Sequence, residues 1–225
     1  MARKQLSPGQ LALGLALPTS WAREDFLEVP GNAAALAAVE GEAQPALVLY
    51  GPPGCGKTHL AQIWAASHGA RLIGPADLTP AAVDELARQP LALDDADRNA
   101  DPVALFHLVN LMRERRHALL LTGSAAPAHW SYTLPDLMSR LKAMPAERIA
   151  EPDDALLSAV LVKLFADRQL QVGEDVVKYL AARIERSCRA AREWVAVLDA
   201  AALAENRAVT VMLARRLLEE DAARD

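Results

Sequence analysis

The chain has 225 residues, of which 52% are hydrophobic, and its formal net charge is −5. This length suits an α/β core with a smaller appended domain, whereas the negative charge argues against a protein that attracts DNA over its whole surface. No apolar run approaches the roughly 20 residues of a membrane-spanning helix, and two cysteines are too few for a disulfide framework, so we expect a cytoplasmic protein without a membrane segment.

Residues 1–20 are expected to form an extended N-terminal peptide. Within it, Gln10 is followed by leucines at alternate positions, Leu11, Leu13 and Leu15. Such alternation is typical of a short edge strand, but a glutamine with spaced leucines also suits a peptide that fills pockets on a partner protein. The residues themselves leave both interpretations open.

The next segment is expected to bring the chain into a first strand. A loop over residues 21–32 leads into an alanine-rich helix at 33–40, for which Asn32 is the expected N-cap. The apolar run at 46–50 then predicts a buried strand.

The stretch after this strand has the pattern of a P-loop. Its residues are Gly51, Pro52, Pro53, Gly54, Cys55, Gly56, Lys57 and Thr58. Glycines let backbone N–H groups turn toward a polyphosphate, and the helix that follows directs its positive end to the same anion. Lys57 would contact the terminal phosphates, and the Thr58 hydroxyl would bind Mg²⁺. A chance Gly/Pro turn is the alternative, but the strand before and the helix after favour nucleotide binding.

Strands and helices continue to alternate up to residue 150. The expected strands lie at 71–73, 90–93, 118–122 and near 148–149, and the expected helices at 80–88, 102–116 and 134–142. This alternation predicts an α/β fold with a parallel sheet. The remainder is helical by pattern, with helices near 153–168, 174–186, 189–205 and 210–222. We therefore divide the chain into a peptide at 1–20, an α/β core at 21–150 and a helical lid domain at 151–225.

Five further residues are candidates for the nucleotide site. At the end of one strand, Asp94 would hold Mg²⁺ through water and Asp95 would orient the attacking water, with an acidic turn as the alternative. Ser124 ends the next strand and would approach the terminal phosphate, although serine is also a common turn former. Arg140 suits a cation that is delivered across a subunit interface, and Arg189 could reach the nucleotide from the lid.

These stretches together resemble the AAA+ ATPases, and among them the branch of the bacterial initiator DnaA. The residues that carry the resemblance are Gly51-Pro52-Pro53-Gly54-Cys55-Gly56-Lys57-Thr58, Asp94-Asp95, Leu121-Thr122-Gly123-Ser124, Leu137-Met138-Ser139-Arg140-Leu141 and Arg189. A DnaA-like core preceded by the peptide around Gln10 is similar to the Hda family, the regulatory inactivators of DnaA. No helix-turn-helix domain is expected, because the chain ends where DnaA would begin one.

The resemblance implies a three-layer αβα core with an all-α lid, and ADP or ATP with Mg²⁺ as the cofactor. It assigns Asp94 and Asp95 to the second nucleotide motif, Ser124 to the first sensor, Arg140 to the trans-acting arginine finger and Arg189 to the second sensor. Gln10, Leu11, Leu13 and Leu15 match a peptide that binds the sliding clamp of the replicase. The chain departs from the pattern at Ser124, where Asp is common, and at Gly14, where the clamp peptide commonly has Pro.

The implied function is regulation of replication initiation. A nucleotide-loaded protein, docked on the clamp and reaching DNA through it, would press Arg140 against ATP on DnaA and promote its hydrolysis. A helicase loader or standalone motor ATPase acting with single-stranded DNA or a helicase is the alternative, and a nucleotide-gated scaffold is a third. The basic stretch at 113–116 is most simply a solvated helix end, or else a surface that faces DnaA. Weak hydrolysis by the chain itself and assembly into a homo-oligomer are left open.

Overall fold

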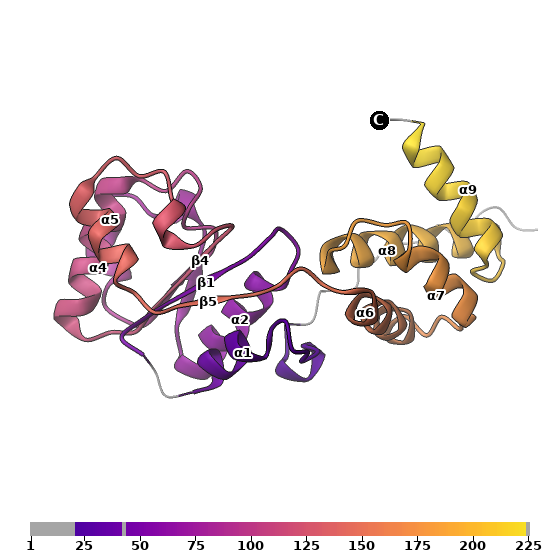
Figure 1. Cartoon of the computed structure of the whole chain (residues 1–225), viewed down its shortest axis with the longest axis horizontal. Coiled ribbons are helices and arrows are strands. Elements are labelled where there is room, and N and C mark those ends of the chain that lie inside the picture. Colours follow the sequence, from indigo (N-terminus) through magenta and orange to yellow (C-terminus); the bar gives the residue numbers. More distant parts are fainter. Residues whose placement is uncertain (1–20, 42–43, 224–225) are drawn as a thin grey trace, which may run out of the picture.

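The computed structural model describes residues 21–41 and 44–223, so the expected clamp-binding residues Gln10, Leu11, Leu13 and Leu15 lie outside the described residues. The core is built on a five-stranded parallel sheet in the order β2-β3-β4-β1-β5 (Figure 1). The strands are β1 (Ala46–Tyr50), β2 (Arg71–Ile73), β3 (Leu91–Leu93), β4 (Leu119–Gly123) and β5 (Ala146–Arg148). Because the strands are parallel, the loops that follow β1, β3 and β4 gather at one edge of the sheet.

Helices cover both faces of this sheet. They are α1 (Ala33–Glu40), α2 (Lys57–His68), α3 (Val83–Leu86), α4 (Pro102–Arg115) and α5 (Pro135–Lys142). Leu47 and Leu49 of β1 pack with α1 and α2, whereas Val48 packs with α3, α4 and α5. Successive side chains of a strand point to opposite faces, so one unbroken apolar run serves both cores. The expected three-layer αβα core is confirmed.

The chain beyond β5 forms a helical lid domain with a core of its own. Its helices are α6 (Asp154–Asp167), α7 (Glu174–Ala181), α8 (Cys188–Glu205) and α9 (Val211–Ala222). Leu161, Phe165 and Leu198 are buried at its centre. Figure 1 shows the lid on the side of α1 and α2, away from α4 and α5. No helix of the described residues is long and apolar enough to cross a membrane.

Two helices are shorter than the sequence pattern indicated. The segment expected as a helix at 80–88 begins with a turn, in which the Ala82 N–H donates to the Thr79 carbonyl at 3.0 Å, so α3 itself is brief. The helix expected up to residue 186 ends at Ala181, because the chain turns there and buries Ser187. The Ser187 hydroxyl then accepts the Ala190 N–H at 3.0 Å and caps α8.

Candidate functional site

The P-loop joins β1 to α2 in a conformation that its glycines make possible. Gly54 and Gly56 have φ angles of 72° and 107°, the left-handed region that side chains disfavour. A Cβ at Gly51 would lie 2.3 Å from the Ile149 carbonyl oxygen, and a Cβ at Gly54 would lie 2.4 Å from the Ser187 Cβ. The backbone therefore forms a close-packed cradle at the N-terminus of a 12-residue helix, the setting in which backbone N–H groups bind phosphate.

Lys57 places its ammonium group at the mouth of this cradle. Its side chain is buried, and Nζ donates to the carbonyl oxygens of Gly51 and Pro52, both at 2.9 Å. Both acceptors are neutral carbonyls, and a phosphate oxygen is a stronger acceptor for an ammonium than a carbonyl. When a phosphate binds, Lys57 can therefore replace its two hydrogen bonds to backbone carbonyls with bonds to phosphate oxygens.

Thr58 and Asp94 bring a hydroxyl and a carboxylate together beside the cradle. The Thr58 Oγ1 donates to Asp94 Oδ2 at 2.7 Å, and Thr122 of β4 donates to the other oxygen of Asp94. Hydroxyl and carboxylate oxygens are the ligands that Mg²⁺ prefers, together with water and substrate phosphate. The arrangement therefore fits the metal that the P-loop pattern implied.

Asp95 is held in an unusual backbone conformation next to this pair. Its φ angle is 50°, and its N–H donates to Thr122 Oγ1 at 2.8 Å. This region of φ is less costly for aspartate than for most residues, and such conformations cluster at functional sites. Partial burial and then the nearby Asp94 carboxylate raise the pKa of Asp95 above its ordinary value. A carboxylate with a raised pKa is a better proton acceptor for a water that it orients.

Ser124 does not present a free hydroxyl at the end of β4. Its N–H donates to Asp97 Oδ2 at 2.7 Å, and its Oγ donates to the same oxygen. The second oxygen of Asp97, Oδ1, is buried without a hydrogen-bond partner among the described residues. A carboxylate from the β3 loop thus stands beside the position where the first sensor often has Asp, and the sensor role of Ser124 stays a prediction.

The first turn of α8 brings the lid into contact with the P-loop. The Cys188 N–H donates to the Gly54 carbonyl at 2.9 Å. Arg189, the next residue, has an exposed side chain that lies 3.9 Å from Glu185 and 4.0 Å from Glu193. Exposed ion pairs of this length contribute little, so its guanidinium can leave them at small cost. A Cβ at Gly54 would lie 3.4 Å from the Arg189 Cβ, so the start of this side chain is at the P-loop, whereas its guanidinium pairs with Glu185 and Glu193.

A cavity of about 380 Å³ lies between the core and the lid, directly beside the P-loop. Phe26, Leu156 and Val160 supply apolar walls, and Cys55 and Gly56 of the P-loop form one end. A cavity of this size and lining suits a flat heterocyclic base with its sugar, whose phosphates would reach the cradle. Both domains and the segment before α1 contribute to it.

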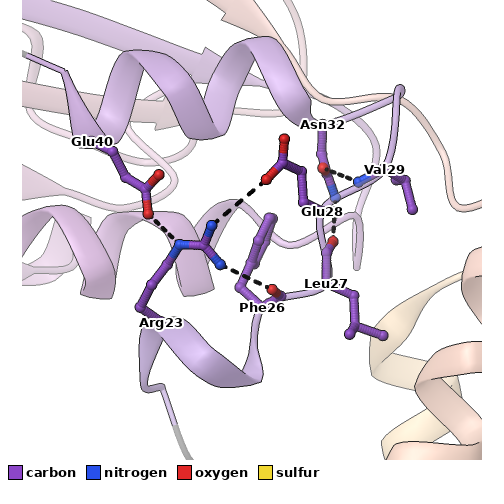
Figure 2. A network of polar contacts seen from close by, with 7 residues as sticks. All are labelled: Arg23, Phe26, Leu27, Glu28, Val29, Asn32 and Glu40. Atoms are coloured by element: carbon purple, nitrogen blue, oxygen red, sulfur yellow. Dashed lines mark hydrogen bonds and ion pairs between the residues drawn. The ribbon is translucent and has the colours of Figure 1, made fainter.

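That segment, residues 21–32, is referred to here as the N-terminal strap. Figure 2 shows Arg23 reaching Glu40 at the end of α1, Glu28 at 3.7 Å and the Phe26 carbonyl at 3.3 Å. Asn32 is buried and closes the second half of the strap, accepting the Val29 N–H and donating to the Leu27 carbonyl, each at 2.9 Å. Asn32 does stand at the N-cap position of α1, but the expected side-chain cap is not made. Its amide is instead used within the strap, and Asn32 is one of the residues that line the cavity.

The relationship to known proteins rests on both domains. Residues 154–218 match the family model of the Hda lid domain. Domain III of the replication initiation protein DnaA from Thermotoga maritima has the same fold, with a TM-score of 0.77 at 21% identity over 89% of this chain and 96% of that chain. The lid of this chain therefore matches the Hda lid family, and the chain has the fold of DnaA domain III.

Other solved AAA+ structures share the fold at lower similarity. DnaA from Aquifex aeolicus bound to AMPPCP has a TM-score of 0.66 at 20% identity, over 78% of this chain and 63% of that chain. The RuvB Holliday junction branch migration motor of Thermotoga maritima has a TM-score of 0.64 at 16% identity, over 82% and 64%. This chain therefore spans less than two thirds of those longer proteins.

Arg140, the finger position expected of a DnaA-branch protein, lies apart from the P-loop cluster. It projects from α5 with its guanidinium carbon 5.4 Å from the ring centre of Phe106. It lines a cavity with Ala46 and Leu119, the first residues of β1 and β4, whereas the P-loop follows the other end of β1. Five residues of strand span about 16 Å, so Arg140 does not reach the P-loop of its own chain.

The structure also shows site residues that the sequence did not reveal. Thr122 is fully buried and joins Asp94 to Asp95, and Asp97 accepts both donors of Ser124. The available signal for Thr122 was a polar residue ending an otherwise apolar strand. Asp97 had none, since it is one acid in an acidic loop.

Proposed function

We propose that this chain binds ADP or ATP with Mg²⁺ in the cleft between the P-loop and the lid. The cradle of Gly51 to Gly56, the buried Lys57 and the paired Thr58 and Asp94 support this proposal, and the adjoining cavity has the size of a nucleoside. The DnaA structure from Aquifex aeolicus, which shares the fold, is bound to the ATP analogue AMPPCP.

The nucleotide-loaded protein then acts as a regulator of DnaA. It docks on the sliding clamp through Gln10, Leu11, Leu13 and Leu15, and it promotes hydrolysis of ATP bound to DnaA by inserting Arg140 as an arginine finger. The observation that carries this proposal is the location of Arg140. Its guanidinium is half-buried, lies about a strand length from its own P-loop and makes no ion pair with a described carboxylate. An arginine that forms no ion pair and lies far from the P-loop of its own chain is suited to contact the phosphates of a nucleotide bound to another protein.

The test follows ATP on DnaA in the presence of this protein and clamp-loaded DNA. We expect Arg140→Ala to remove most of the stimulation, by about 10³-fold or more, while nucleotide affinity of the chain itself is kept. Lys142→Ala is the matched control, because Lys142 is exposed on the same short helix and is absent from the cavity around Arg140. Full stimulation by Arg140→Ala would refute the finger.

The tether is tested separately. Replacing Gln10 and Leu11 with Ala should abolish binding to immobilised clamp without changing ADP affinity, because the peptide precedes the folded core. Clamp binding at the level of the unaltered protein would exclude this peptide as the docking element. That result would leave the proposed role of Arg140 unaffected.

One observation favours the motor ATPase as a second candidate. The hydrogen-bonded group of Thr58, Asp94, Thr122 and Asp95 is complete within the chain and includes a carboxylate with a raised pKa. Such a group can orient a water for hydrolysis of the chain's own ATP. If Arg140→Ala leaves DnaA-bound ATP hydrolysis intact and abolishes turnover of the chain's own ATP, the motor is the correct function.

A further inference from the structure

A second cavity, of about 550 Å³, opens between α4 and α5 at the amino ends of the strands. It is referred to here as the α4–α5 pocket. Its floor is apolar and is formed by Val109, Met112, Leu119 and Met144. These side chains also belong to, or pack against, the core beneath the sheet, so the floor is firmly held. A preformed apolar hollow of this size accommodates one large side chain of another molecule.

Two guanidinium groups line the same pocket. Arg113 comes from the last turn of α4 and Arg140 from α5, and neither makes an ion pair with a carboxylate of the described residues. Asp136 also lines the pocket one turn before Arg140, but the two do not pair. By contrast, Arg115 on the neighbouring face of α4 donates to both the carbonyl and the carboxylate of Asp84. Neither guanidinium of the pocket is therefore engaged in an ion pair, although one carboxylate, that of Asp136, lines the same pocket.

This combination specifies the chemistry of an occupant. An apolar floor takes an aliphatic or aromatic side chain, and an unpaired guanidinium at the rim takes a carboxylate in a charge-assisted hydrogen bond. Arg140 belongs to the rim, so any protein whose nucleotide receives Arg140 also covers the pocket. The pocket is thus continuous with the surface that the proposed function requires.

We infer that the α4–α5 pocket is the docking site for the ATP-bound partner, and that it receives an apolar side chain with a carboxylate beside it. This inference rests on the proposed function and assigns binding of the partner and action on its nucleotide to different arginines. Arg113 binds the carboxylate and sets the affinity for the partner, whereas Arg140 acts on the phosphates and sets the rate.

The test separates affinity from rate. Stimulation of ATP hydrolysis on DnaA is titrated with Arg113→Glu and with Ala143→Trp, which fills the pocket from its exposed edge. Both should raise the half-saturating concentration by about tenfold or more without lowering the maximal rate, since one reverses a charge and the other blocks a pocket at an interface. Two variants serve as controls, Arg116→Glu at the exposed end of α4 outside the pocket and Ala200→Trp at an exposed position of the lid. Each control should change the half-saturating concentration by less than about twofold.

Direct binding of ATP-loaded DnaA to the immobilised proteins gives a readout that needs no hydrolysis. Loss of binding by Arg113→Glu and Ala143→Trp, with retention by Arg140→Ala, is the expected result. Native half-saturation and native binding in both pocket variants would overturn the inference, as would a fall in maximal rate alone. Sedimentation completes the test, because loss of self-association with DnaA binding intact would identify a second copy of this chain as the occupant. If Arg140→Ala abolishes the stimulation of hydrolysis while the two pocket variants stimulate and bind DnaA normally, the proposed function stands and only this inference fails.

Discussion

Lys163 of α6 and Asp25 of the N-terminal strap form an ion pair of 2.5 Å that connects the lid to the core. A second contact lies close by, where the guanidinium carbon of Arg192 in α8 is 5.4 Å from the ring centre of Trp21. The same strap is fixed to the core by edge contacts of Trp21 and Phe26 with His59 of α2. Both domains therefore hold one segment, and that segment forms part of the cavity beside the P-loop.

The strap contacts predict that the lid position and nucleotide affinity depend on the Lys163–Asp25 pair. Asp25→Asn and Lys163→Met should each weaken ADP binding severalfold, because the ion pair contributes about 1 kcal/mol to the attachment of the lid to the strap. The double variant should be no weaker than the worse single one, since both remove the same contact. Calorimetry measures the affinities, and Lys178→Met, which breaks the exposed pair with Glu174, is the control. Additive losses would show that the two residues act independently.

Lys57 provides a prediction for the nucleotide itself. Lys57→Ala should lower ADP and ATP affinity by about tenfold or more, because it removes the buried ammonium of the P-loop. It also leaves the Gly51 and Pro52 carbonyls without their donor, so a melting curve must accompany the titration. Lys178→Ala, an exposed lid substitution, should bind normally. Native ADP affinity in a folded Lys57→Ala protein would remove the P-loop from the proposed function.

Much of the fold could be predicted from local patterns. Apolar runs of three to five residues alternating with helices predicted the parallel sheet, and the Gly/Pro stretch after residue 50 predicted the P-loop at its carboxyl edge. The match of residues 154–218 to the Hda lid family and the shared fold with DnaA domain III agree with the resemblance that these motifs indicated. These features depend on residues that are close in sequence.

The remaining details depend on which strands are neighbours. Thr122 holds Asp94 because β3 and β4 are adjacent, and the two residues are 28 positions apart. Asp97 meets Ser124 for the same reason. Asn32 matched a helix-cap pattern, yet its amide is used by the strap, because a local propensity does not show which of several nearby backbone groups a side chain will bond.

Thr122 gives a prediction that local patterns could not supply. Thr122→Val keeps the shape of this buried side chain but removes the hydroxyl that orients Asp94 and Asp95. We expect ATP affinity in the presence of Mg²⁺ to fall by about tenfold and ATP affinity in EDTA to be unchanged. The reason is that hydrogen bonds to metal-binding side chains hold those side chains in the orientation that the metal needs. Thr133→Val, at an exposed position, is the control. An equal loss with and without Mg²⁺ would point to general destabilisation instead.

His59 makes the stability of the strap depend on pH. The ring is buried, its Nε2 lies 3.0 Å from the Ala22 carbonyl oxygen, and burial is the main cause that lowers the pKa of His59 below its ordinary value of 6.5. Arg192 of the lid lowers this pKa further, whereas the Ala22 carbonyl and Asp25 of the strap oppose the shift. The folded protein therefore keeps His59 neutral at a pH where the unfolded chain binds a proton.

The sign of the pH effect follows from this difference. As the pH falls below about 6.5, the unfolded state takes up the proton first, so the stability that His59 contributes above that pH is progressively lost. Melting temperatures of the unaltered protein and of His59→Asn, measured between pH 8 and pH 5, should differ most at pH 8 and converge toward pH 5. The difference isolates the effect of His59, because the four other histidines are the same in both proteins. A gap that stays constant across this range would show that His59 is protonated equally in the folded and unfolded states.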